Sequence, residues 1–251
     1  MASTAINMID LSGKKVLILG GAHEIAQGVA EAFRIAGARV ALGTHSESTS
    51  NGFEHFQAPL HDPEVLAEEL LERDFDSVII SPGWFEHGTF LSMSLADIDK
   101  ALSANFEYAT YAAQAAAKSL IHRKQAGSII FLCSVAGLMP MIHTNLAGST
   151  LAAIHVIARM AAVDLAPHQI RVNVVASGWV DKNWSQDMVR TDGFMLTPED
   201  IPMGNAGSTQ SVGDACCFLV SSLSRYITGI ILPVDGGFLL TKSAAASPFR
   251  S

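Results

Sequence analysis

The sequence predicts one α/β domain of the doubly wound Rossmann type, a parallel sheet with helices on both faces. Short, continuously apolar segments alternate along the chain with longer segments of helical periodicity, which is the pattern of βαβ units. The 251 residues are 49% hydrophobic and 16% charged, a composition that supports a large buried core. No linker, repeat or low-complexity block divides residues 1–251, and only residues 241–251 read as a tail.

The expected elements alternate in strict order. Continuous apolar character predicts strands buried on both faces, and periodic segments between them predict crossover helices. Helices 25–36, 63–71, 95–118, 146–165 and 211–219 are expected between the strands. The strands are 15–19 (KVLIL), 39–42 (RVAL), 77–80 (SVII), 128–132 (SIIFL), 171–175 (RVNVV) and 230–234 (IILPV).

Charge and cysteine content narrow the class of protein. A net charge of −8 argues against nucleic acid or an anionic membrane as the main partner. The first residues lack a long apolar region, no run of about 18 apolar residues occurs, and we expect a soluble cytoplasmic protein. Cys133, Cys216 and Cys217 have apolar neighbours and no metal-ligand spacing, so we expect buried thiols and no metal site.

Several ordered motifs resemble the short-chain dehydrogenase/reductase family. They are GGA at 20–22, Asn105 in the fourth helix, FLCSVAGL at 131–138, IRVNVVASGWV at 170–180, IPMGNAG at 201–207 and YITGIILPVDGGF at 226–238. The resemblance covers roughly residues 11–240. It implies a nicotinamide-dependent oxidoreductase, and its last segment implies a homo-oligomer, either a homodimer or a homotetramer.

The loop after the first strand departs from the family pattern Thr-Gly-x-x-x-Gly-x-Gly. Gly20 and Gly21 are candidates to approach a pyrophosphate, but the middle glycine is deleted and Ala26 stands at the third. Gly28, one turn later, does not restore the spacing. Glu24 would repel a diphosphate, although it is also a favourable acidic residue in the first turn of a helix.

The second strand lacks the acidic residue that holds the ribose of NAD. It ends at Thr44 and His45, so the cofactor is left unknown, with NADP favoured over NAD if a dinucleotide binds. Thr44, Ser46 and a protonated His45 are candidates to meet a 2′-phosphate, but no arginine or lysine stands nearby. At the end of the strand at 77–80, residues 80–83 have the sequence ISPG, where relatives have Asn-Asn-Ala-Gly, and Gly83 is the matching glycine.

The expected proton relay is missing. In relatives, a serine is followed thirteen residues later by Tyr-x-x-x-Lys, in which the tyrosine is the general acid/base and the lysine lowers its pKa. Here Ser134 is present, but Ala147 and Leu151 replace the pair, and neither side chain can carry a proton. No tyrosine elsewhere has a lysine four residues later. Ser134 and Asn105 match catalytic positions, yet they also fit a turn cap and a backbone contact.

Other polar and aromatic residues are candidates for the same crevice. His143 precedes the fifth helix and is a candidate replacement acid, or an incidental loop histidine. Lys182, where relatives have a threonine that reaches the nicotinamide amide, either points into the pocket or is solvated. Trp84, Trp179 and Trp184 follow strands at the ligand-binding edge and form either a pocket wall or a lid contact.

Three functions follow from these observations. The favoured one is a diverged family member that has lost hydride transfer and uses the crevice for small-molecule binding or non-redox chemistry. The second is an NAD(P)H-dependent oxidoreductase of carbonyl or hydroxyl substrates, in which Ser134, His143 and Lys182 replace the usual residues. The third is a non-catalytic subunit that pairs with an active homologue.

Overall fold

The computed structural model describes residues 9–20, 22–44, 52–59, 62–83, 88–141, 144–180 and 201–240. Seven strands form one sheet in the order β3-β2-β1-β4-β5-β6-β7, and every pair is parallel. The predicted doubly wound architecture is confirmed. Strand order reverses between β1 and β4, which are neighbours in the sheet although β2 and β3 lie between them in sequence.

The elements follow the predicted alternation. The strands are β1 (Lys15–Leu19), β2 (Arg39–Thr44), β3 (Glu54–Gln57), β4 (Ser77–Ile80), β5 (Gly127–Ser134), β6 (Ile170–Ser177) and β7 (Ile231–Val234). The α-helices are α1 (Glu24–Ile35), α2 (Pro63–Glu72), α3 (Leu95–Ala101), α4 (Tyr108–His122), α5 (Asn145–Leu165) and α6 (Thr209–Val220). Short 3-10 turns include η1 (Phe90–Ser92), η3 (Val135–Gly137), η4 (Ala166–His168) and η7 (Ser222–Ser224).

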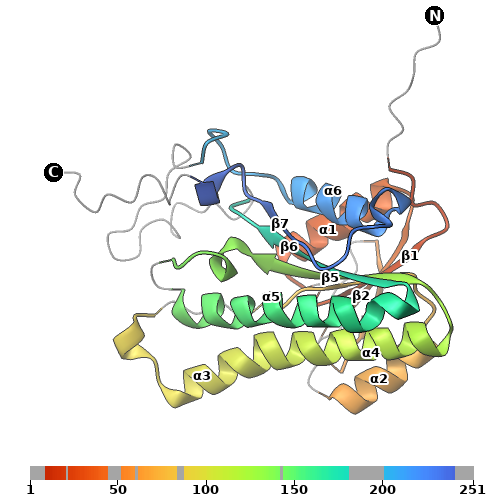
Figure 1. The fold of residues 1–251 in the computed structure, drawn as a ribbon, viewed down its shortest axis with the longest axis horizontal. Coiled ribbons are helices and arrows are strands. Elements are labelled where there is room, and N and C mark those ends of the chain that lie inside the picture. The colour runs from red at the N-terminus through yellow and green to blue at the C-terminus, as the bar shows by residue number, and fades with distance from the viewer. Residues whose placement is uncertain are drawn as a thin grey trace, which may run out of the picture.

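The sheet divides the core into two apolar layers. Helices α1 and α6 cover one face, and α2, α4 and α5 cover the other (Figure 1). Alternation along β1 sends Leu17 and Leu19 into the second layer and Val16 and Ile18 into the first. A strand that is apolar on both sides is therefore buried on both sides, as its sequence predicts.

Two expectations about the elements were wrong. Strand β3 was not predicted, because EHFQ is short, polar and at the edge of the sheet, so it lacks a continuous apolar run. The single helix expected over 95–118 is interrupted by a π-helical segment, η2 (Leu102–Glu107), between α3 and α4. Such segments widen a helix locally and are frequent at functional sites.

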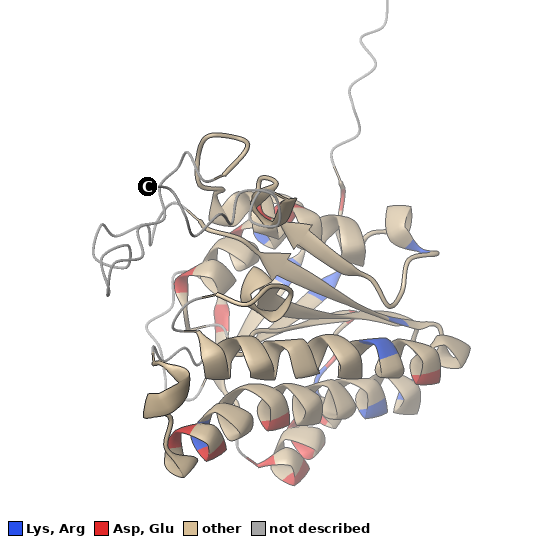
Figure 2. Cartoon of the chain, turned by 60° about the vertical axis from the view of Figure 1, so that its left-hand side comes forward, with Lys and Arg blue, Asp and Glu red and all other residues tan. Residues whose placement is uncertain are grey.

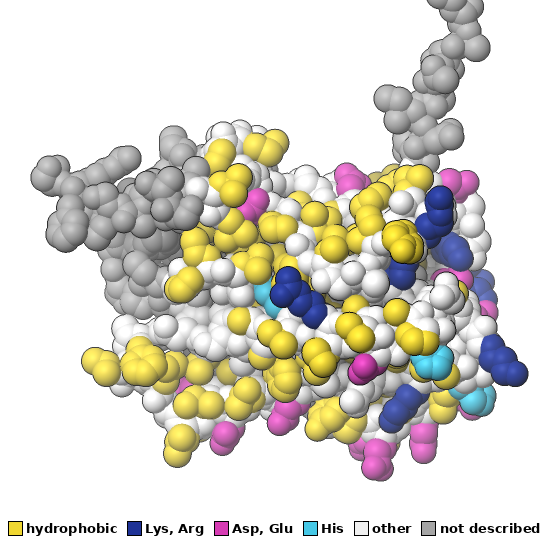
Figure 3. Space-filling model, viewed as in Figure 1, with side chains coloured by type: hydrophobic (Ala, Val, Ile, Leu, Met, Phe, Trp, Pro, Cys, Tyr) yellow, Lys and Arg dark blue, Asp and Glu magenta, His cyan; other side chains and the backbone are white. Residues whose placement is uncertain are grey.

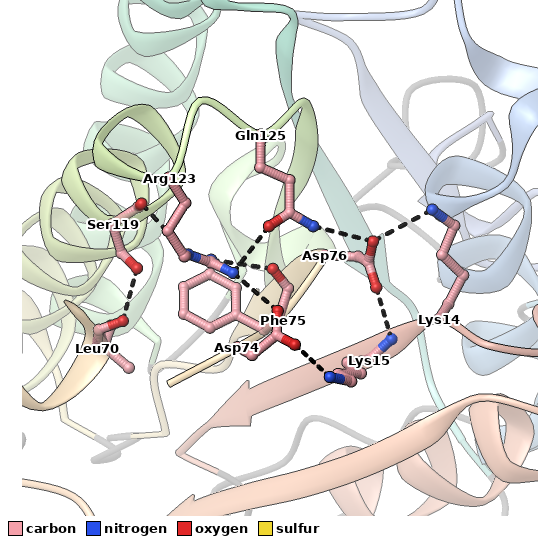
Figure 4. A network of polar contacts seen from close by, with 9 residues as sticks. All are labelled: Lys14, Lys15, Leu70, Asp74, Phe75, Asp76, Ser119, Arg123 and Gln125. Carbon is pink, nitrogen blue, oxygen red and sulfur yellow. Dashed lines mark hydrogen bonds and ion pairs between the residues drawn. The ribbon is translucent and has the colours of Figure 1, made fainter. Parts of the chain in front are cut away.

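A polar network holds together the edge of the sheet at which the strands begin. Asp76 accepts hydrogen bonds from the backbone N–H of Lys15 at 2.8 Å and from the side chain of Gln125 at 3.1 Å, and Lys14 pairs with it at 3.2 Å (Figure 4). Arg123 reaches Asp74 at 3.1 Å. These contacts tie the starts of β1, β4 and β5 together at the edge opposite the strand ends.

Candidate functional site

The candidate site lies where the parallel strands end. The segments after β1, β2, β4 and β5 meet at this edge because all these strands run in one direction. The reversal of strand order between β1 and β4 is the place where doubly wound sheets bind ligands. The sequence candidates Gly20, Thr44, Gly83 and Ser134 all fall at this edge, whereas Gly21 and His45 lie outside the described residues.

Gly20 is fixed by the packing of two strand ends. Its φ is +80°, a conformation that favours glycine, and its N–H donates to the carbonyl of Gly43 at 3.0 Å. A β-carbon at Gly20 would stand 2.2 Å from the carbonyl oxygen of Ser81. This glycine therefore lets β1 and the end of β4 approach each other, whatever ligand the crevice takes.

Gly28 and Ala26 belong to the helix rather than to an open loop. A β-carbon at Gly28 would stand 2.2 Å from the side chain of Thr209, so this glycine allows α1 to pack closely on α6. Ala26 is fully buried in the same layer. Gly28 lies beyond the first turn of α1, so this glycine does not replace the one that is missing from the loop.

A histidine and a serine that sequence reasoning did not single out meet at the crossing of β1 and β4. His23 is the N-cap of α1, and its Nε2 lies 2.5 Å from the Oγ of Ser81, directly after β4. Burial lowers the pKa of His23, which favours the neutral imidazole. Gly83 lies against the ring, since a β-carbon there would be 3.6 Å from Cδ2. The only sequence signal was at Ser81, which stands in the segment where the family has Asn-Asn-Ala-Gly.

Thr44 ends β2 as a buried residue. Its carbonyl accepts a hydrogen bond from the N–H of Ala58 at 2.8 Å, which links β2 to the segment after β3. Its side chain carries no charge, so β2 ends, in the part of the chain that the structure describes, without a carboxylate for a ribose.

Ala147 and Leu151 face inward from α5, and both are 1% exposed. Leu151 belongs to the apolar layer shared by α2, α4 and α5. Ser134, at the end of β5, accepts a hydrogen bond from the N–H of Ala136 at 3.2 Å and so caps the turn η3. No titratable group takes the tyrosine and lysine positions.

Asn105 and Tyr108 lie next to one another where η2 meets α4. The amide of the buried Asn105 donates to Oγ1 of Thr150 at 3.0 Å, and that hydroxyl donates to the carbonyl of Leu146 at 2.8 Å. The phenol oxygen of Tyr108 is buried and has no hydrogen-bond partner among the described residues. It would lie 3.1 Å from a β-carbon at Gly20, so it reaches the same crossing of β1 and β4, and burial raises its pKa.

The remaining candidates lie apart or outside the described residues. His143, Lys182, Trp84 and Trp184 are outside them. Trp179 packs edge-on against Phe238, with ring centroids 6.5 Å apart, in a small apolar cluster beyond β6. Within the described ranges, no group of three or more His, Cys, Asp or Glu side chains is arranged to hold a metal ion.

The comparisons with known proteins place the chain in a family. A family model described as enoyl-(acyl carrier protein) reductase matches residues 20–239. The L-xylulose reductase of Mesocricetus auratus is 28% identical, covering 93% of this chain and 99% of its own length. The 3-oxoacyl-[acyl-carrier-protein] reductase of Aquifex aeolicus is 27% identical, covering 91% and 98%. The chain belongs to the short-chain dehydrogenase/reductase family.

Solved structures agree with this assignment. A short-chain dehydrogenase/reductase from Mycobacterium marinum superposes with a TM-score of 0.81 at 26% identity, covering 92% of this chain and 97% of its own. A short-chain dehydrogenase from Leptospira borgpetersenii, solved with bound NAD+, gives a TM-score of 0.81 at 25% identity, covering 91% and 94%. Relatives of this chain are thus oxidoreductases over nearly its whole length.

The charge of this family member is unevenly placed. Five basic residues lie at the starts of strands or shortly before them: Lys14, Lys15, Arg39, Arg123 and Arg171. These five therefore lie at the edge where the strands begin, away from the crevice (Figure 2). At the crevice, Glu24 adds a carboxylate to the first turn of α1.

Proposed function

We propose that this chain is a diverged family member that no longer transfers hydride and uses the crevice to bind, or to transform without redox chemistry, a small apolar or carbonyl-containing molecule. One observation carries the proposal. Helix α5 holds Ala147 and Leu151, buried among apolar side chains, at the positions of the family's tyrosine and lysine. Neither side chain can give or take a proton.

The other tyrosines do not take over the role. Tyr108 is buried beneath Gly20 on α4, Tyr111 is on the outer part of the same helix, and Tyr226 is fully exposed near the start of β7. Loss of a general acid alone typically removes a factor of about 10²–10⁴ in rate. The lysine that tunes this acid is replaced as well, which supports a loss of the whole relay.

The nucleotide loop supports the same proposal, because its residues do not fit a dinucleotide. The imidazole of His23 bridges to Ser81 across the crossing of β1 and β4. Glu24 places a negative charge in the first turn of α1, where a diphosphate would need N–H groups and a positive dipole end. If a dinucleotide binds nevertheless, the uncharged Thr44 favours NADP over NAD.

The proposal is tested by titrating the protein with NADPH and NADH, with tryptophan fluorescence and calorimetry as readouts. We expect no saturable binding below about 1 mM, and micromolar affinity for NADPH would refute the proposal. A Glu24→Gln variant separates charge from shape. We expect this variant to bind neither NADPH nor NADH, because it still lacks the middle glycine of the loop and still carries the His23 ring.

We further propose that a second copy of the chain binds to the outer face of α4 and α5. This face carries exposed apolar side chains, with Val156 62%, Met160 55% and Val163 70% exposed, around a groove of about 340 Å³ between the helices. Hydrophobic atoms are spread over this side of the molecule in Figure 3. Large exposed apolar patches mark interaction surfaces.

Light scattering on the purified protein tests this assembly. We expect a dimer or tetramer, and Met160→Lys should shift it toward monomer, whereas the exposed Lys124→Ala at the end of α4 should not. A monomeric wild type, or co-purification with a homologue that retains Tyr-x-x-x-Lys, would instead favour a hetero-oligomeric subunit.

We also propose a cytoplasmic location. All three cysteines are buried free thiols, which suits a reducing compartment. Residues Asn145–His168 are long and apolar enough to cross a membrane by length and composition. The packing of α5 against β6 and η3, together with its apolar outer face, accounts for this composition.

A further inference from the structure

We propose that Ser81 and His23 form a nucleophile–base pair that transfers the acyl group of a small ester or thioester to water. This inference rests on the proposed function, because a bound dinucleotide would cross the same edge of the sheet. The contact that carries it joins Nε2 of His23 to Oγ of Ser81 at 2.5 Å. This distance is within hydrogen-bond reach for a nucleophile and its base.

Ser81 differs from the other serines at this edge. Ser134 uses its hydroxyl to cap η3, and the hydroxyl of Ser177 donates to the carbonyl of Gly178 at 3.0 Å. Of the serines that close β4, β5 and β6 in the described residues, Ser81 alone contacts an imidazole. The pair joins residues 58 positions apart in sequence, so the fold and not local geometry brings them together.

His23 is suited to act as the base. Burial lowers its pKa from the ordinary value, which favours the neutral imidazole, and in the tautomer with the proton on Nδ1 its Nε2 can accept the proton of Ser81. Its ring is held between Ser81 and Gly83, which fixes its orientation toward the hydroxyl.

The start of α1 supplies donors beside the pair. His23 is the N-cap residue, but its side chain does not cap the helix, so it leaves the N–H groups of the first turn of α1 to other acceptors. Backbone N–H groups at a helix N-terminus stabilise a developing oxyanion. A second polar group points to a ligand: the buried phenol of Tyr108, without a partner in the described residues, reaches the same crossing from α4.

The reaction balances with water as the only co-reactant. Ser81 Oγ attacks the carbonyl carbon while its proton passes to Nε2 of His23, and the electron pair of the carbonyl moves to oxygen. When the tetrahedral intermediate collapses, the alcohol or thiol leaves with the proton from His23. Water then attacks the acyl-serine, His23 takes its proton and returns it to Ser81 Oγ, and a carboxylic acid is released. Nothing is oxidised or reduced.

The surroundings favour an uncharged acyl group. The basic residues Lys14, Lys15, Arg39, Arg123 and Arg171 lie at the opposite edge of the sheet, and Glu24 stands next to His23. An anionic acyl group would therefore meet a carboxylate without a compensating cation among the described residues.

The test uses a fluorophosphonate probe, which phosphonylates activated serines, with intact and peptide mass spectrometry, and p-nitrophenyl acetate as the substrate. We expect one label, on Ser81, and ester hydrolysis that Ser81→Ala abolishes. His23→Ala should slow labelling and hydrolysis by about 100-fold or more, the usual effect of losing a general base. Ser81 is 2% exposed, and the exposed residues Ser149 and His122 control for reaction of the reagents with surface side chains: Ser149→Ala and His122→Ala should keep the wild-type rates.

A Ser81→Cys variant covers the case in which the alanine variant does not fold. Its thiol should react with iodoacetamide, and His23→Ala in that background should slow alkylation by about 100-fold. Wild-type protein without a label on Ser81, or His23→Ala variants that react at the parent rate, would overturn this inference. If NADPH also fails to bind, the proposed function survives that result; micromolar NADPH binding would overturn both.

Discussion

Replacing Leu151 by lysine restores the residue type that relatives have at this position, and the expected result is a severe loss of stability. Leu151 is 1% exposed and packs in the apolar layer beneath the sheet with neighbours from α4 and β5. In relatives the resemblance implies a lysine beside a tyrosine and a cofactor ribose. Here the position is surrounded by core side chains, so an ammonium group would have no partner.

The magnitude follows from two contributions. Removing the buried leucine side chain forfeits about 1.5–3 kcal/mol of apolar burial, partly recovered by the lysine stem. A buried lysine at pH 7 must also lose its proton, which costs about 5 kcal/mol because its ordinary pKa of about 10.4 lies more than three units higher. We expect Leu151→Lys to lower the free energy of unfolding by about 5 kcal/mol, comparable to the total stability of many domains.

The loss should depend on pH. In the folded variant the pKa of the lysine is depressed below its unfolded value, so the unfolded chain binds more protons and stability rises with pH. The difference from the wild type should therefore narrow by about 1.4 kcal/mol per pH unit between pH 7 and pH 9.

Urea unfolding followed by tryptophan fluorescence measures the free energy of unfolding of each variant and its dependence on pH. Leu151→Met conserves volume and should cost less than about 1.5 kcal/mol. Val156→Lys, five residues along α5 and 62% exposed, should change stability by no more than about 0.5 kcal/mol in the monomer. A Leu151→Lys protein within about 1 kcal/mol of the wild type, without pH dependence, would mean that position 151 opens onto a solvated crevice, which would contradict the loss of the proton relay that we propose.

Three further predictions concern packing. Gly20→Ala should lower the free energy of unfolding in urea by about 3 kcal/mol or more, because the φ of Gly20 is +80° and a β-carbon there meets a carbonyl oxygen at 2.2 Å. Gly13 has a φ of +81° but no atom within 4 Å of a β-carbon, so Gly13→Ala should cost only the backbone strain of about 1–2 kcal/mol. Gly28→Ala should lower the free energy of unfolding by disturbing the contact of α1 with α6, and adding Thr209→Gly should recover part of that loss. If the destabilisations of the two single variants simply add in the double variant, the 2.2 Å distance between a β-carbon at Gly28 and the Thr209 side chain would be contradicted. The three cysteines should not react with a disulfide reagent at pH 8 until the protein unfolds, because burial raises the pKa values of their thiols, that of Cys217 to about 12. Fast reaction of the folded protein would contradict their burial.

The sheet could be predicted from the sequence because its central strands are buried on both faces. Their apolar runs have one physical explanation, and the strands predicted at 77–80 and 128–132 correspond to β4 and β5. Strand β3 has no such signal: it is an edge strand of four residues that pairs with β2 alone, and its sequence is compatible with a loop. The interruption at η2 was equally invisible, since its residues keep helical periodicity.

The site was predictable only where one residue type decides the chemistry. The absence of an acid at Ala147 follows from its identity alone. Contacts between distant segments do not: the bond from Asn105 to Thr150 spans 45 positions, and the pair of His23 and Ser81 spans 58. Such pairs depend on the register of strands and the start of a helix, and no local pattern specifies them.

The changes at the relay and at the nucleotide loop are physically coupled. A lysine on α5 is tolerable in a core only while a tyrosine and a cofactor ribose accept its hydrogen bonds, since an unpaired buried cation is strongly destabilising. Under the function that we propose, the loop that holds His23 against Ser81 and a carboxylate at Glu24 binds no cofactor, and leucine then removes a charge that would have no partner. The apolar residues on α5 are the stable solution for a fold without the cofactor, so the proposed loss of dinucleotide binding at the loop predicts the loss of the lysine on α5.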